Sequence, residues 1–173
     1  MNKTNVSIRL QVITTYILIY LAVAAVLFSL GFMTNFFNLF MDGNEEMYNF
    51  FKAVQELNNK VFGWSVIALV LSLVYIPFEL NKGAAGFFGM IYTILTGLFN
   101  GLKGISILGK TSSFNEMYNQ IDFSSLADYR VSTMPFTLAS VFAVLIMVVS
   151  LSLTLLSIIN YFSITRRGGS NEA

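Results

Sequence analysis

Side chains that could carry out chemistry are few in this sequence of 173 residues. It contains neither histidine nor cysteine, which removes thiolate nucleophiles, the usual zinc sites and the most common acid or base near neutral pH. The Asp and Glu residues lie outside the centres of the long apolar stretches. An enzyme acting within a membrane would need such groups at depth. We therefore predict that the protein is not an enzyme, and that it binds no metal and no cofactor.

Two polar residues stand out in an otherwise apolar stretch. Asn100 lies one helical turn before Lys103, so in a helix the two side chains lie near one another. Together they could line a polar cavity. Alternatively, Asn100 forms a hydrogen bond to a neighbouring helix, as amide side chains do within membranes.

Small residues recur along the same stretch at intervals of three or four positions. The set, here called the glycine face, is Gly86, Gly89, Thr93, Gly97, Gly101 and Gly104. This spacing places them on one side of a helix, and Gly97 with Gly101 forms a GxxxG pattern that allows helix backbones to approach closely. We expect the glycine face to pack against another helix, either of this chain, of a second copy or of a different membrane subunit.

The elements that must position these residues are predicted to be transmembrane helices. Charged residues make up only 11% of the chain, against about 25% in a typical soluble domain. A bilayer core of about 30 Å requires about 20 apolar residues in a helix. The four apolar stretches cover residues 10–33, 61–78, 84–104 and 134–162. The sequence thus predicts an all-α, polytopic membrane protein, with residues 1–173 forming a single domain built as a four-helix bundle.

The distribution of basic residues predicts the orientation of this bundle. Lys3 and Arg9 precede the first span, and Arg166 with Arg167 follows the last. The basic residues of the longer loops are interspersed with acidic ones. Because positive charge beside a span favours the cytoplasm, we predict that both termini are cytoplasmic and that the protein resides in the cell membrane, which in a bacterium is the cytoplasmic (inner) membrane.

Two longer connections, at about residues 34–60 and 105–133, then lie outside. Each is predicted to contain a short amphipathic helix, because apolar residues follow a helical spacing there. The first helix would begin with a capping box formed by Asp42 and Glu45, and the second with one formed by Ser113 and Glu116.

A four-residue sequence occurs in both of these connections. Residues 46–49 read EMYN, and the same letters recur at 116–119. A two-span repeat, residues 1–80 and 81–160, of a kind known among transporters would explain the recurrence. Coincidence is the alternative interpretation.

These features favour a structural function in the membrane. We predict a small non-enzymatic subunit or assembly component of a membrane complex, with the lipid bilayer and other membrane proteins or further copies as its partners. The alternative is a small transporter or pore component that acts as an oligomer, since the spans lack the central charges of ion-coupled transporters. A net charge of +1 gives no indication of a nucleic-acid partner.

Overall fold

The computed structural model describes residues 3–80, 86–126 and 129–168. They form α1 (Lys3–Gly31), η1 (Phe32–Phe36), α2 (Phe37–Met41), α3 (Glu45–Leu80), α4 (Phe87–Tyr118) and α5 (Met134–Gly168). This described part of the chain is helical and contains no strand. Four of its helices are long and apolar enough to cross a membrane. The predictions of an all-α chain and of four candidate spans are therefore confirmed.

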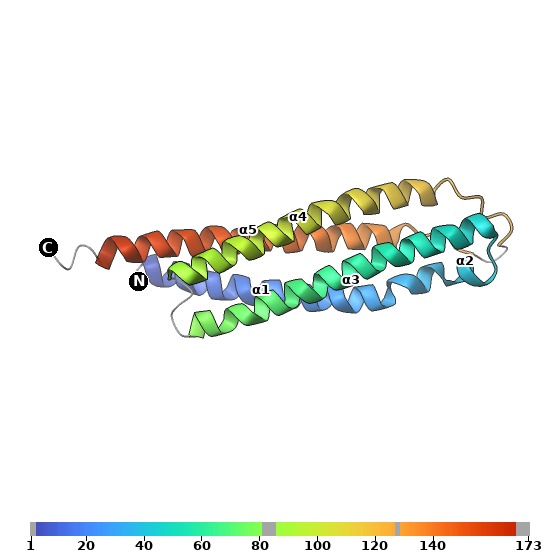
Figure 1. Ribbon diagram of the computed structural model, residues 1–173. Coiled ribbons are helices and arrows are strands. Elements are labelled where there is room, and N and C mark those ends of the chain that lie inside the picture. Colours follow the sequence, from blue (N-terminus) through green and yellow to red (C-terminus); the bar gives the residue numbers. More distant parts are fainter. Residues whose placement is uncertain (1–2, 81–85, 127–128, 169–173) are drawn as a thin grey trace.

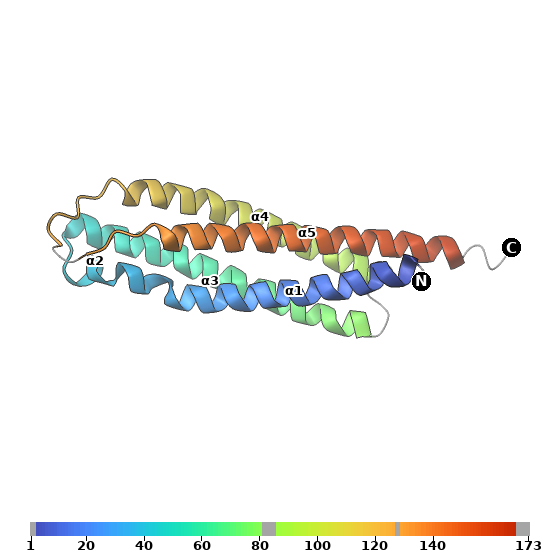
Figure 2. The ribbon, with the colours of Figure 1, turned by 180° about the vertical axis from the view of Figure 1, so that it is seen from behind.

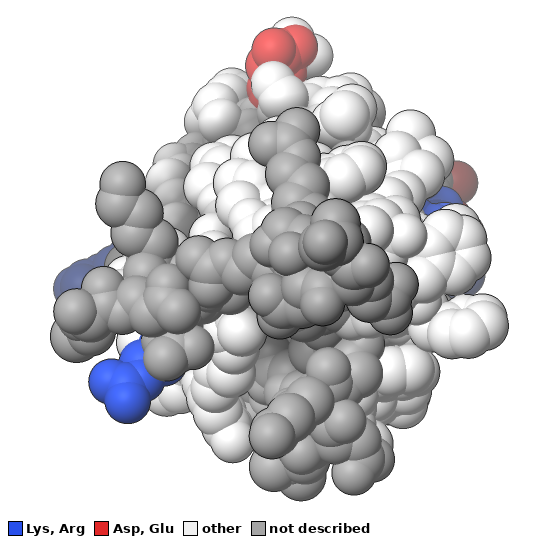
Figure 3. Space-filling model, turned by 90° about the vertical axis from the view of Figure 1, so that its left-hand side faces the viewer, with Lys and Arg blue, Asp and Glu red and all other residues white. Residues whose placement is uncertain are grey.

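The four long helices form an elongated bundle in which each runs antiparallel to the next (Figure 1). α1 packs against α3, α3 against α4, and α4 against α5, while α5 closes the bundle on α1 (Figure 2). Both termini lie at one end, here called the terminal end, and α2 lies at the opposite end, here called the loop end. Viewed from the terminal end, the described surface is mostly free of charged side chains (Figure 3).

A cluster of aromatic rings holds the loop end together. The ring of Phe36 in η1 lies 5.3 to 6.5 Å, between centroids, from the rings of four other residues. These partners are Phe32 in η1, Phe50 in α3, Tyr118 in α4 and Phe136 in α5. Aromatic pairs contribute about 0.5–1.5 kcal/mol each beyond the burial of their area. The cluster thus joins every long helix except α1, to which η1 is directly connected.

α3 passes through most of the connection predicted at residues 34–60. Buried Met47, Phe50, Val54 and Leu57 belong to its first turns and not to a separate amphipathic helix, so that prediction is wrong. The buried positions continue in phase to Trp64, and neither glycine nor proline interrupts the segment before residue 63. One continuous helix therefore buries the whole apolar side without the cost of two extra helix ends.

The helix predicted to begin at Ser113 is likewise wrong as a separate element. Ser113 and Glu116 lie within α4, which continues to Tyr118. The cap of α3 also differs from the expected one: the side-chain oxygen of Asn44 accepts the backbone N–H of Met47 at 2.9 Å. Asp42 instead ends α2, and its backbone N–H donates to the Asn38 carbonyl at 2.9 Å.

The two EMYN sequences occupy different places in the helices that contain them. Residues 46–49 lie in the first turns of α3, whereas residues 116–119 lie at the end of α4. A shift of 70 residues does not bring the helix boundaries into register, because α5 begins only at Met134. The recurrence therefore gives the two-span repeat no structural support. The two sequences are nevertheless neighbours in space, since Glu46, Asn49 and Met117 line one shallow pocket.

Candidate functional site

The glycine face of α4 packs onto α5 of the same chain. A Cβ atom added to Gly97 would overlap the hydroxyl oxygen of Thr154, and one added to Gly104 would overlap the side chain of Met147. Across this contact, the Thr154 hydroxyl donates to the backbone carbonyl of Thr93 at 2.8 Å. Glycine at these positions allows the backbones to approach, as in other close helix pairs in membranes. The structure thus places this part of the glycine face inside the bundle.

The members of the glycine face do not share one environment. Gly89, Thr93, Gly97 and Gly104 are buried. Gly86 caps the start of α4 and is partly exposed. Gly101 is also partly exposed, and a Cβ atom added there would meet no other atom within 4 Å. The second glycine of the GxxxG pattern therefore lies beside the contact rather than in it.

Asn100 connects three helices through its amide group. The indole N–H of Trp64 in α3 donates to Asn100 Oδ1 at 3.2 Å, and Asn100 Nδ2 donates to the hydroxyl of Ser150 in α5 at 2.9 Å. Asn100 is fully buried at 0% exposure. A buried amide that lost these partners would be costly in an apolar surrounding. The structure thus gives Asn100 the interhelical role, and the residue does not line the neighbouring groove.

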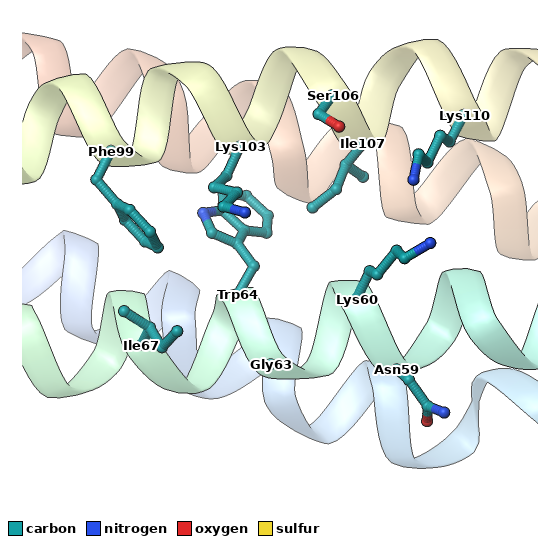
Figure 4. A pocket seen from close by; sticks show the side chains of 10 residues that line it. All are labelled: Asn59, Lys60, Gly63, Trp64, Ile67, Phe99, Lys103, Ser106, Ile107 and Lys110. Carbon is teal, nitrogen blue, oxygen red and sulfur yellow. The ribbon is translucent and has the colours of Figure 1, made fainter.

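Lys103 lies on the other side of this contact, in an open groove of about 330 Å³ between α3 and α4. Trp64 and Phe99 form part of its wall (Figure 4). Two further lysines, Lys60 and Lys110, line the same groove. Asn100 therefore lies in the core, whereas Lys103 lies in this surface groove. We call the groove lined by Lys60, Lys103 and Lys110 the lysine groove.

Sequence reasoning missed the meeting of the three lysines. Lys60 and Lys110 point toward one another from α3 and α4 (Figure 4), although each was assigned to a different outer connection. The signal that could have revealed this is the uninterrupted helical pattern on both sides of each lysine. If α3 and α4 are extended as single antiparallel helices, the lysines come to the same level of the bundle.

A second polar network, also not predicted, lies near the terminal end. The Gln11 amide in α1 donates to the Tyr75 hydroxyl in α3, and the Asn160 amide in α5 donates to Gln11 Oε1. All three side chains are at most 2% exposed. The signal that could have revealed it is the presence of uncharged amide side chains within apolar stretches. This network links α1, α3 and α5, whereas Asn100 links α3, α4 and α5.

The described residues bring together no group of three or more acidic side chains that could hold a metal ion. The polar groups at the sites described above offer hydrogen bonding and, at the lysines, the attraction of anions. In comparisons with known proteins, no family matches the chain, and neither a curated protein nor a solved structure is significantly similar to it.

Proposed function

We propose that the protein is a non-enzymatic, multi-pass subunit of a membrane complex, and that it assembles through the side of the bundle formed by α1, α2 and α5. The proposal is carried by one observation, a difference in the length of the uncharged part of each helix. The thickness of a bilayer core accounts for the length of the uncharged part in α3 and α4, but not for its length in the other two long helices.

The uncharged parts fall into a short and a long class. On α3 the stretch between Lys60 and Glu79 is uncharged, and on α4 the stretch from Phe87 to Lys103. At about 1.5 Å per residue these measure about 24–28 Å, which suits a bilayer core of about 30 Å. From Arg9 to Asp42, through α1 and α2, the uncharged stretch measures about 48 Å, and α5 has a similar one. The excess lies toward the loop end.

This excess carries exposed apolar side chains. Leu27 and Leu30 of α1 are 63% and 66% exposed. Exposed apolar side chains in the loop-end half also include Phe37, Phe40 and Met41 of α2 and Val141, Val144 and Leu145 of α5. α1 and α5 run side by side on one side of the bundle (Figure 2). Exposed apolar side chains beyond the depth of the bilayer core are typical of a protein interface, and an apolar helix of another subunit or a second copy fits them.

The orientation supports the same arrangement. Both termini lie at one end of the bundle (Figure 1). We infer that this end is cytoplasmic, because basic residues flank the first and last helices and the positive-inside rule favours the cytoplasm for them. The interface would then lie at the outer side of the cell membrane. Reporter fusions to the C-terminus and to the segment joining α4 to α5 test this orientation, and a cytoplasmic location of the latter would contradict it.

Photo-crosslinking in intact cells tests the interface. A photoreactive residue replaces Leu30, and in a matched variant it replaces Leu98, which is 57% exposed on α4 at bilayer depth. We expect position 30 to give one discrete protein adduct, identified by mass spectrometry, and position 98 to give lipid adducts. The triple variant Leu27→Ala, Leu30→Ala and Phe37→Ala should no longer co-purify in mild detergent with the partner identified by crosslinking. Leu98→Ala should still co-purify with it.

The outcomes separate the candidate functions. A monomer without protein adducts at position 30 would contradict the subunit proposal. A symmetric homo-oligomer that conducts ions when reconstituted in vesicles would replace it with the small transporter or pore component considered from the sequence. Circular dichroism of each variant shows whether the helices remain folded.

A further inference from the structure

The lysine groove combines three positive charges with open space. Lys60, Lys103 and Lys110 all line it, and the side chains of Lys60 and Lys110 point toward one another (Figure 4). Glu56 is the one carboxylate that acts on Lys110, and no salt bridge is formed by these lysines within the described part of the chain. Like charges repel, and one carboxylate does not balance three ammonium groups, so the groove is suited to binding an anion.

The groove lies at the depth of a bilayer interface. Lys60 ends the uncharged stretch of α3, and Lys103 ends that of α4. Lys60 lies about 28 Å from Glu79 along α3, and Lys103 lies about 24 Å from Phe87 along α4. Both distances are close to the thickness of the bilayer core. Lys110 lies two helical turns farther out. Lipid headgroups of the leaflet nearer the loop end occupy this level.

The lining of the groove also suits a lipid. Phe99 and Ile67 lie on the side of the groove toward the terminal end, Lys60 and Lys110 lie on the side toward the loop end, and Trp64 and Lys103 lie between them (Figure 4). An acyl chain could lie against the apolar side chains while the headgroup meets the ammonium groups. Tryptophan is enriched at this level of membrane proteins, where one end of the side chain is apolar and the other polar.

The geometry points to the lysine groove as a binding site for the phosphate group of an anionic lipid, with Lys60 and Lys110 on the phosphate and Lys103 near the glycerol region. A basic residue close to an anionic surface strengthens binding by about fivefold, so three act together as a selective site. The groove lies on the α3–α4 side, away from the α1–α5 interface proposed above, and its occupancy does not depend on that interface.

Trp64 makes the site directly measurable, because it is the only tryptophan in the chain. The purified protein is reconstituted into nanodiscs of phosphatidylcholine that contain a small fraction of brominated phosphatidylglycerol or, at the same fraction, brominated phosphatidylcholine. Bromine quenches tryptophan fluorescence at short range, and Trp64, although only 3% exposed, lines the groove. We expect the anionic lipid to quench Trp64 at least about twofold more strongly, whereas equal quenching by the two lipids would overturn the proposal.

Matched variants assign the effect to the groove. Lys60→Gln with Lys110→Gln should lower the preference for the anionic lipid by on the order of tenfold. Lys52→Gln is the control, because Lys52 is also exposed on α3 but lies over the Tyr48 ring and outside the groove. A preference that survives the double substitution, or that is lost equally in the control, would contradict the site. Thermal unfolding in detergent verifies that each variant is folded.

A second experiment distinguishes binding of a lipid from binding of a free anion. Inorganic phosphate is added to the protein in pure phosphatidylcholine nanodiscs, and Trp64 emission is recorded. We expect no change at millimolar phosphate, since the free anion lacks the acyl chains that contact the apolar side chains of the groove. A phosphate-induced change that requires Lys60 and Lys110, without any preference for brominated phosphatidylglycerol, would overturn the lipid assignment in favour of a soluble phosphate compound.

Discussion

α4 has two neighbours, and it meets them in opposite ways. Toward α5 it presents Gly97 and Gly104, where an added Cβ atom would overlap the partner helix. Toward α3, at the level of Lys103, it leaves an open groove lined by charged and aromatic side chains. Asn100 lies between the two sides and forms a hydrogen bond with each neighbour.

The difference shows how one helix can be both a structural and an accessible element. Small side chains close the contact with α5, because van der Waals packing is the main attraction between helices in lipid. Long charged side chains hold the contact with α3 open, because their ammonium groups must remain near water or an anion. The Asn100 bridge fixes the position of α4 between them.

Substitution of Gly97 should have the largest effect on this arrangement. Gly97→Ala forces the Thr154 side chain away and breaks its hydrogen bond to the Thr93 carbonyl. We expect the free energy of unfolding to fall by about 1–3 kcal/mol, the range for overpacked sites. Gly104→Ala should cost less, because the flexible side chain of Met147 can move aside.

Gly101→Ala is the matched control, since its Cβ atom would meet open space. Unfolding of each variant in mixed detergent micelles, followed by circular dichroism, gives the comparison. If Gly101→Ala lowered the free energy of unfolding as much as Gly97→Ala, the α4–α5 contact would not depend on which positions of α4 hold small residues.

The sequence was sufficient for the number of long helices but not for their lengths. Uncharged stretches identify the part of a helix that lipid can surround, so the interior of each helix was predicted correctly. The helical extension from Glu45 to Lys60 carries charges, and a charged residue marks the end of a span that is predicted from uncharged stretches alone. In the structure the same segment buries Phe50 and Val54 inside the bundle, and packing against protein, not lipid, determines where the helix begins.

The sites show the same limit. Regular spacing was enough to place the glycine face on one side of α4, but whether Gly97 or Gly101 meets α5 depends on a rotation that spacing does not specify. Lys60 and Lys110 are far apart in sequence, and only the antiparallel pairing of α3 with α4 brings them together (Figure 4). Contacts between helices are long-range properties, and local patterns contain little information about them.

Removal of the Asn100 bridge should have an intermediate effect. Asn100→Leu leaves the indole N–H of Trp64 without its acceptor and the Ser150 hydroxyl without its donor. We expect a loss of about 1–2 kcal/mol and a shift of Trp64 emission to shorter wavelength. Asn49→Leu is the control, because Asn49 is also exposed on α3 but lies outside the groove that Trp64 lines. An unchanged emission spectrum in Asn100→Leu would contradict the bridge.

The smallest effect is expected at the loop end, where Tyr118 of α4 contacts Phe50 of α3 and Phe136 of α5. Tyr129 shares a hydrogen bond with the Tyr118 hydroxyl and donates to the Asn35 carbonyl at 3.1 Å. Tyr129→Phe should therefore lower the free energy of unfolding by about 1 kcal/mol at neutral pH. Tyr48→Phe, for which no comparable hydrogen bond is found in the described residues, is the control.

The dependence of this loss on pH tests its cause. Burial and the hydrogen bond with Tyr118 raise the pKa of Tyr129 above its ordinary value, so the folded state favours the neutral phenol. The stabilisation is complete below the ordinary pKa of about 10 and is lost as pH rises above it. The difference between the wild-type protein and Tyr129→Phe should consequently shrink above about pH 10. A difference that stays constant into the alkaline range would mean that Tyr129 acts through its ring alone, and that the two sides of α4 are joined at this end by packing without a hydrogen bond.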